Sequence, residues 1–133
     1  MATNQQIREG IATQLETIPD LQVYATPPGS IVVPAAVVRR RNTTYDVSLD
    51  GVVDTTWTVT VFVQFANNDS AAEHLDTYVT STGDHSVKAA VETDPTLGGV
   101  VDFAAVTSAE GEKVTNYAGI DYLSVDFTIQ IGD

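Results

Sequence analysis

The residues whose types could support chemistry in this sequence are two histidines with acidic neighbours. His74 lies close to Glu73 and Asp76, and His85 follows Asp84. Imidazole and carboxylate groups can bind a metal ion or move a proton, but the spacing of these residues matches no established ligand pattern. Solvated surface histidines are therefore favoured, and we expect no metal site and no cofactor.

Hydrolytic chemistry has as little support. The sequence contains no Gly-x-Ser-x-Gly elbow, and Gly98-Gly99 is not followed by the Lys-Ser/Thr of a phosphate loop. Glu110 and Glu112 flank a glycine in an expected turn, where no cleft separates the pKa values of the two carboxyl groups. We expect no enzyme, with a small hydrolase or an acidic ligand-binding domain kept as the alternative of a different class.

The charge of the chain is unevenly distributed. The net charge is −12, and residues 54–133 hold thirteen acidic residues against two lysines. A surface of this sign repels polyanions, which argues against an ordinary nucleic-acid binder. The one basic run is Arg39-Arg40-Arg41, which we expect at the end of a strand, with a solvated strand end as the plain alternative. We hypothesise that this run, with Tyr45 and Asp46 beyond it, contacts an acidic neighbouring subunit or partner.

Length and composition predict one domain spanning residues 1–133. A 43% hydrophobic fraction is ordinary for a chain that buries a core, and without cysteine the chain can form neither disulfides nor thiolate metal sites. No apolar run is long enough to cross a membrane, so we expect no membrane contact. The first ten residues lack the apolar core of a signal peptide, which leads us to expect an intracellular product.

The stretch Asp54–Ala66 predicts the central strand. Trp57, Val59, Val61, Val63 and Phe65 occur at every second position, which places them on one face, and threonine fills most of the gaps. Because the run is long and contains no Gly or Pro, we expect pairing on both sides. On the threonine face, we expect either solvent or contact with a helix edge or another subunit.

The spacing of apolar residues and the positions of helix- and strand-breaking residues predict the remaining elements. We expect helices over residues 3–17, 71–79 and 87–93, the first with Ile7, Ile11, Leu15 and Ile18 inward. Strands are expected over residues 21–26, 31–40, 100–107, 113–117 and 120–131, with a turn at residues 109–112. Pro34 argues for an edge strand or a bulge, and residues 41–53 for a long connection or projecting hairpin.

This order predicts an α+β fold. An antiparallel or mixed β-sheet of about four main strands is flanked by an N-terminal helix and two central helices. The elements do not alternate as they do in a doubly wound fold.

The segment Ser86–Asp102, SVKAAVETDPTLGGVVD, has the most specific pattern in the chain. A Ser-Val-Lys-x-Ala-hydrophobic-Glu helix precedes an Asp, a Thr-Leu-Gly-Gly turn and a Val-rich strand. The segment resembles the helix–turn–strand of tail terminator proteins of long-tailed phages, especially those of actinobacterial phages. The N-terminal helix, the Pro-rich link, the Trp57 strand and the alternating last strand occur in matching order, whereas residues 41–53 match no family pattern.

The resemblance implies a structural protein of the virion. Tail terminators form a hexameric ring that caps the finished tail tube, stops its growth and presents a surface to the head–tail connector, or stopper, protein. The implied partners are other copies of the chain, the tail tube protein and the connector, at the head-proximal end of the tail after assembly in the host cytoplasm. Another head–tail joining or tail-completion protein is the nearest alternative.

Passage of DNA through such a ring adds a physical expectation. Duplex DNA carries about one charge per 1.7 Å, so a basic lining would retain it and an acidic lining would let it slide. We therefore expect Glu110, Glu112 and Asp121 to line the lumen. A ring also needs heterologous contacts, for which residues 39–53 are the candidate.

Overall fold

The computed structural model describes residues 4–19, 21–26, 28–44, 54–64, 68–80 and 82–132. In chain order the elements are α1 (Asn4–Leu15), β1 (Gln22–Tyr24), β2 (Ala35–Thr44), β3 (Asp54–Gln64), α2 (Asn68–Val79), α3 (Val87–Glu92), β4 (Phe103–Tyr117) and β5 (Ile120–Gly132).

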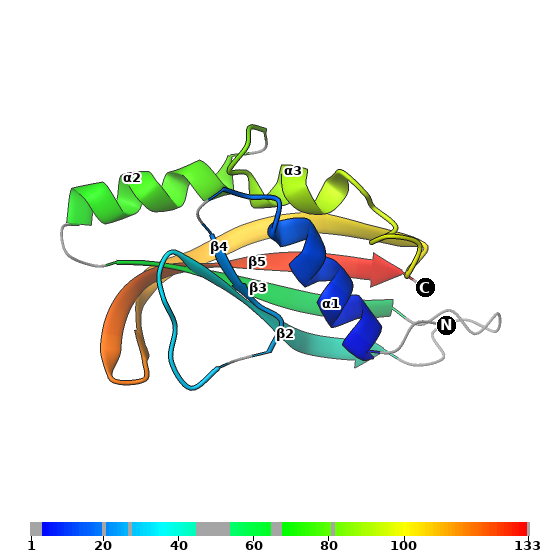
Figure 1. Ribbon diagram of the computed structural model, residues 1–133, viewed down its shortest axis with the longest axis horizontal. Helices are drawn as coiled ribbons and strands as arrows, with labels where there is room; N and C mark the ends of the chain where they lie inside the picture. Colours follow the sequence, from blue (N-terminus) through cyan, green and yellow to red (C-terminus); the bar gives the residue numbers. More distant parts are fainter. Residues whose placement is uncertain are drawn as a thin grey trace.

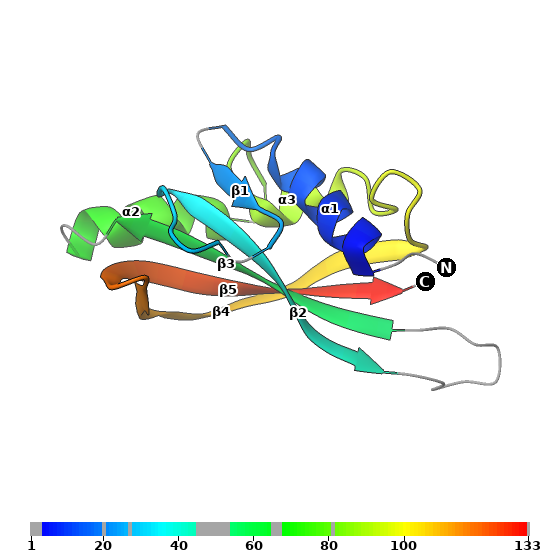
Figure 2. The same cartoon turned by 60° about the horizontal axis from the view of Figure 1, so that its bottom comes forward.

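The strands form one five-stranded sheet in the order β1-β2-β3-β5-β4. β1 pairs parallel with β2, and every other pair is antiparallel. The α+β class with a mixed sheet is thus confirmed, although the described residues form five strands and not about four, since the three-residue β1 also pairs. β3 is bordered by β2 and β5, as the uninterrupted alternation of its sequence predicted. Figure 2 shows the strong twist of the sheet.

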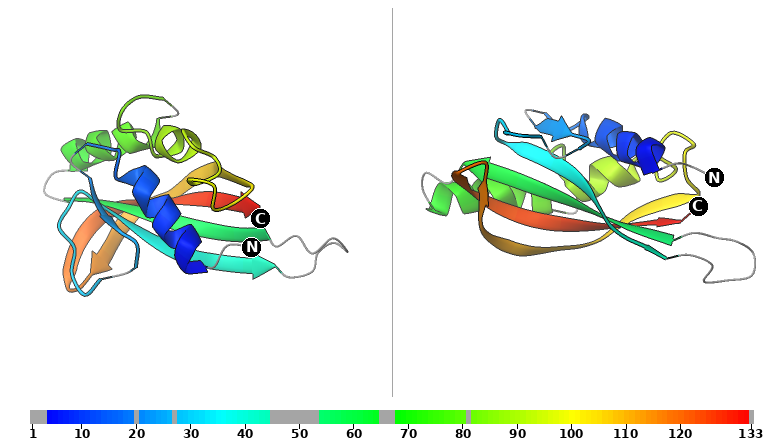
Figure 3. Two further views of the ribbon diagram at one scale, coloured as in Figure 1. Left: turned by 45° about the vertical axis from the view of Figure 1, so that its right-hand side comes forward. Right: turned by 90° about the horizontal axis from the view of Figure 1, so that it is seen from below.

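All three helices cover the same face of the sheet (Figures 1 and 3). The expected inward residues of α1 are buried, and alternate residues of β3 and β5 meet them. Trp57 at the centre of this core is fully buried, and the side chain of Arg8 lies over its ring, with the guanidinium carbon 5.5 Å from the ring centroid. Val79 is 42% exposed, because it lies in the last turn of α2, where the helix leaves the sheet.

The expected turn at residues 109–112 is wrong. β4 runs without interruption through it, and two bulges absorb the turn-like residues. Between Val106 and Ser108, and again between Glu110 and Lys113, β4 has one residue more than β5. Each extra residue bends a strand and increases its twist, so the β4–β5 hairpin curls away from the helices (Figure 1).

Two expectations for β2 also need correction. Pro34 directly precedes the strand, and β2 is an interior strand between β1 and β3, so the edge position is wrong. Arg39 and Arg40 lie in mid-strand and not at its end, and a bulge falls between Arg40 and Asn42. Residues 41–44 extend β2 as one arm of a hairpin with β3. None of the helices in the described ranges is long and apolar enough to span a bilayer.

Candidate interface on the open face of the sheet

The face of the sheet opposite the helices, here called the open face, carries a second and smaller hydrophobic cluster. Val37, Phe62 and Tyr122 are buried there, with Tyr117 packed against them. Phe62 meets the rings of Tyr117 and Tyr122 edge-on, at centroid distances of 5.5 and 6.0 Å. The Tyr117 hydroxyl donates a hydrogen bond to the Pro28 carbonyl. The tip of the β4–β5 hairpin is therefore tied to the segment before β2, and together they close one end of the open face.

Next to this cluster lies a polar network on the four strands β2, β3, β4 and β5. Asp126 of β5 is its centre: its Oδ1 accepts a hydrogen bond from the Thr60 hydroxyl at 2.7 Å, and its Oδ2 lies 3.3 Å from Lys113 Nζ. Arg39 Nη2 of β2 donates to the Thr60 hydroxyl at 2.5 Å and lies 3.9 Å from Asp126 Oδ1. Two cations thus converge on one carboxylate in a chain of net charge −12.

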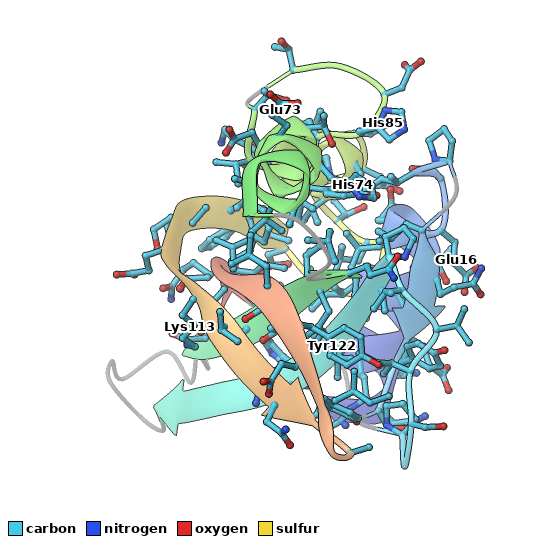
Figure 4. The ribbon with its side chains drawn as sticks, turned by 90° about the vertical axis from the view of Figure 1, so that its left-hand side faces the viewer. Glu16, Glu73, His74, His85, Lys113 and Tyr122 are labelled. Atoms are coloured by element: carbon cyan, nitrogen blue, oxygen red, sulfur yellow. The ribbon has the colours of Figure 1, made fainter. Side chains whose placement is uncertain are left out.

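The network lines a hollow of about 250 Å³ whose floor is the aromatic cluster. The side chains of Arg39 and Lys113 are 51% and 55% exposed, against 24% for Asp126. The cations therefore stand at the mouth of the hollow, and the carboxylate lies deeper. Figure 4 shows Lys113 and Tyr122 around the curled hairpin, well away from α2.

The bulge after Glu110 selects which residue joins this network. Asp126 faces Glu110 across the β4–β5 ladder, and two residues earlier on β5, Ser124 faces Lys113. Strict alternation would place Glu112 there, beside a second carboxylate. The extra residue of the bulge moves a lysine into that position. Sequence periodicity missed this residue, and the one available signal was Gly111, since an isolated glycine within a strand often marks a bulge.

Of the residues expected at the basic interface, Arg39 is the one whose side chain the structure describes. Arg39 lies on the open face with partners in its own chain. The backbones of Arg40 and Arg41 belong to β2, but their side chains fall outside the described part, as do Tyr45 and Asp46 altogether. The contact with a neighbouring subunit stays a prediction.

The expected lumen residues do not lie together. Glu110 is exposed and accepts a hydrogen bond from the Ser108 hydroxyl at 3.2 Å, and Asp121 is exposed near the hairpin tip, accepting one from Asn116 at 3.0 Å. Because Glu110 pairs with Asp126, and Asp121 is five residues from it on an unbroken β5, Glu110 and Asp121 leave opposite faces of the hairpin. The side chain of Glu112 lies outside the described part.

The histidines gather around Tyr78 of α2. Its hydroxyl lies 3.3 Å from His74 Nε2, and its ring centroid is 5.5 Å from that of His74 and 6.1 Å from that of His85. Both histidines and Glu73 appear beside α2 in Figure 4. Within the described ranges, no three His, Asp or Glu side chains are grouped so that they could hold a metal ion.

Polar side chains of the segment 86–102 cap α3 and join it to neighbouring elements. Ser86, which is 1% exposed, caps α3: its hydroxyl accepts a hydrogen bond from the Ala89 amide at 3.0 Å and donates to the Thr80 carbonyl. At the other end of α3, Glu92 accepts hydrogen bonds from Lys88 Nζ at 2.6 Å and from the Val106 amide at 3.0 Å. The hydrogen bond from Lys88 is the main cause of a Glu92 pKa below its ordinary value, with burial acting in the opposite direction. Glu92 thus fastens α3 to the outer edge of β4.

The Thr-Leu-Gly-Gly turn is held by Asp94. One carboxylate oxygen accepts hydrogen bonds from the amide and hydroxyl of Thr96 at 3.1 and 2.7 Å, and the other from the Gly98 amide at 3.0 Å. The hydrogen bond from the Thr96 hydroxyl is the first cause of a lowered Asp94 pKa. The turn holds Leu97 at a φ of 52° with its side chain 2% exposed against Gly10 of α1. The turn therefore docks α1 onto the region of α3.

Comparison of the sequence with models of known protein families and with curated proteins returns no match.

Proposed function

We propose that this chain is a structural protein of a phage tail, a terminator that forms a ring and caps the tail tube. The observation that carries the proposal is the build of residues 86–102. The pattern resembling tail terminators forms a capped helix, a tight turn and the approach to a long strand in the order that the resemblance implies. Its polar side chains join α1, α3 and β4 into one unit.

In this role the chain acts through contacts and not through turnover. Copies of the chain meet through heterologous contacts and close a ring, for which six copies are expected. One side of the ring covers the end of the tube and stops addition of tube subunits. The other side receives the head–tail connector protein, which places the chain at the head-proximal end of the tail in the virion.

The acidic surface suits a ring through which DNA passes. Each turn of duplex DNA carries many phosphates, at about one charge per 1.7 Å, so an acidic wall keeps the duplex from adhering. Exposed Glu110 and Asp121 on the β4–β5 hairpin, with Glu112, are the candidates for this wall. As the two described side chains leave opposite faces of the hairpin, one belongs to the lumen surface and the other to its rim.

The hollow on the open face favours a second candidate. A space of about 250 Å³ with two cations at its mouth and aromatic rings at its floor has the features of a ligand-binding domain for a small carboxylate. Such a domain would need no other copy of the chain.

Assembly is the test of the proposal. The purified chain is examined by native mass spectrometry and negative-stain microscopy, alone and with uncapped tail tubes. We expect a closed ring of six copies, on its own or at tube ends, and an end to tube elongation. A chain that stays monomeric and leaves elongation unchanged contradicts the proposal, and binding of a small carboxylate by that monomer would support the second candidate.

The lumen is tested separately by charge reversal. Glu110→Lys with Asp121→Lys is compared with Glu16→Lys with Glu73→Lys, which makes the same change in net charge at exposed sites beside the helices. We expect rings of the first variant to retain duplex DNA at low salt and rings of the second to release it. Equal retention by both variants contradicts the assignment of the lining.

A further inference from the structure

We propose that the hollow on the open face is a receptor for an acidic side chain of a second copy of this chain, with Arg39 and Lys113 as its two ligands. This inference rests on the proposed function in one respect, that copies of the chain meet. It adds the site at which they meet and the chemistry of the contact.

Arg39 and Lys113 have more N–H donors than their contacts with Thr60 and Asp126 use. An arginine has five N–H donors, and one of those of Arg39 is taken by Thr60. Lys113 has three, and one is directed at Asp126 at the long distance of 3.3 Å. The other donors of both side chains have no partner among the described residues. Both side chains are also about half exposed, so the donors are accessible.

The carboxylate of Asp126 is too weakly placed to satisfy both cations. Asp126 lies 3.9 Å from Arg39 Nη2, which is an ion pair without a hydrogen bond, and its Oδ1 already accepts from Thr60. A second carboxylate at the mouth would give the guanidinium the paired N–H···O contacts that its planar fork prefers.

The charge of the chain indicates which molecule supplies the carboxylate. The chain carries 18 acidic residues against 6 basic ones, so copies repel one another unless their contact places a cation against an acid. The structure describes the side chains of four cations, Arg8, Lys88, Arg39 and Lys113. Two of them, Arg39 and Lys113, lie together at this hollow. Lys88 is paired with Glu92, and Arg8 lies over Trp57, which leaves this hollow as the basic surface in the described part that an acidic copy can approach.

The hollow also fits the size of the proposed ligand. About 250 Å³ takes the end of one Asp or Glu side chain with its neighbouring atoms and not a whole helix. Phe62 and Tyr117 at the floor give the methylene groups of that side chain an apolar surface. The ligand is therefore a single carboxylate carried on an exposed segment of the other copy.

Two variants should shift the association in opposite directions. Arg39→Gln with Lys113→Gln removes the cations, and we expect the apparent dissociation constant between copies to rise about tenfold. Asp126→Asn removes the internal competitor and keeps an oxygen that can accept from Thr60, so we expect tighter association by a few-fold. A merely structural role of the network predicts weaker association for both. Thr13→Glu with Thr82→Glu, at two exposed positions elsewhere, controls for the change of −2 in net charge.

Chemical cross-linking identifies the occupant. A carbodiimide joins an amine directly to a carboxylate that touches it, and Lys88 and Lys113 are the two lysines of the chain. Assembled rings made from equal parts of ¹⁴N and ¹⁵N chains should give isotopically mixed peptides that link Lys113 to an acidic residue. Lys88 should link to Glu92 within one chain, which is the internal control, since Nζ and Oε2 are 2.6 Å apart.

The outcomes separate this inference from the proposed function. If rings form but Lys113 links to Asp126 of the same chain alone, and the glutamine variant assembles like the control, the inference is wrong and the proposed function stands. A link from Lys113 to a different tail protein also overturns it, because the occupant is then not a second copy. If no assembly occurs under any condition, the proposed function fails first.

Discussion

Replacing Gly10 with alanine sets two effects of known size against each other. Gly10 lies inside α1, where the structure packs it against the turn at Leu97. A Cβ atom added at Gly10 would lie 3.0 Å from Leu97 Cβ and 3.4 Å from the Leu97 carbonyl oxygen. The first distance is shorter than ordinary carbon contacts, so either α1 or the turn must move.

The magnitudes favour destabilisation. Alanine is better than glycine within a helix by about 1 kcal/mol, whereas overpacking a filled site costs about 1–3 kcal/mol. The obstructing atoms belong to the backbone region of a buried residue, in a turn held by Asp94, and cannot rotate away as the end of a long side chain could. We expect Gly10→Ala to lower the free energy of unfolding by about 1 kcal/mol, as the difference between these terms.

The same substitution can be tested in a second background, the Leu97→Gly variant. Leu97→Gly removes the obstructing Cβ and suits the φ of 52°, although it costs about 3 kcal/mol through the lost buried side chain. In this background the clash is gone and the helix preference remains. Gly10→Ala should then raise the free energy of unfolding by up to about 1 kcal/mol, so the same substitution changes sign.

Urea unfolding followed by the fluorescence of Trp57 measures both values. Trp57 is the one tryptophan of the chain and is fully buried, so its emission reports the loss of the core. The comparison uses transition midpoints at a constant slope. If Gly10→Ala stabilises the parent chain, or acts alike in both backgrounds, then the turn does not dock α1 as described.

Two further predictions concern the ends of α3. Ser86→Ala should lower the free energy of unfolding by about 1–2 kcal/mol, because it removes the cap and leaves buried backbone groups without partners, whereas Ser30→Ala at an exposed site should change it little; thermal and urea unfolding of the two variants measure the difference. Glu92→Gln should cost about 0.5 kcal/mol at neutral pH, the size of a partly exposed ion pair. Since the folded pKa of Glu92 is lowered, the stabilisation by its carboxylate is complete above the ordinary pKa and lost as the pH falls through the folded pKa, so the gap between parent and variant should close in acid; a gap that widens there contradicts the role of Lys88.

Much of the fold could be predicted because most elements show one clean period. The alternation of β3 and β5 and the helical spacing of Ile7, Ile11 and Leu15 each fix a buried face, and the structure buries those faces. The length of β4 could not be predicted, because Ala-Glu-Gly-Glu reads locally as a turn and pairing with β5 overrides that preference.

The candidate site was less accessible from sequence. The basic run indicates a contact role for Arg39. Its partners Thr60 and Asp126 are 21 and 87 residues away, and no local pattern joins them. Lys113 enters the site only because a bulge shifts the register by one residue. Networks that cross four strands depend on register, and register is a property of the whole sheet.

The two bulges of β4 also bear on the behaviour of the chain at high concentration. β4 is an outer strand of fifteen residues, which is a length at which a straight strand recruits others and grows into fibrils. The Val106 amide of β4 already donates a hydrogen bond to Glu92. The two bulges also bend β4, so that a flat strand cannot pair with it in a continuous register. Concentrated solutions of the chain should accordingly resist amyloid-like aggregation without help from a chaperone.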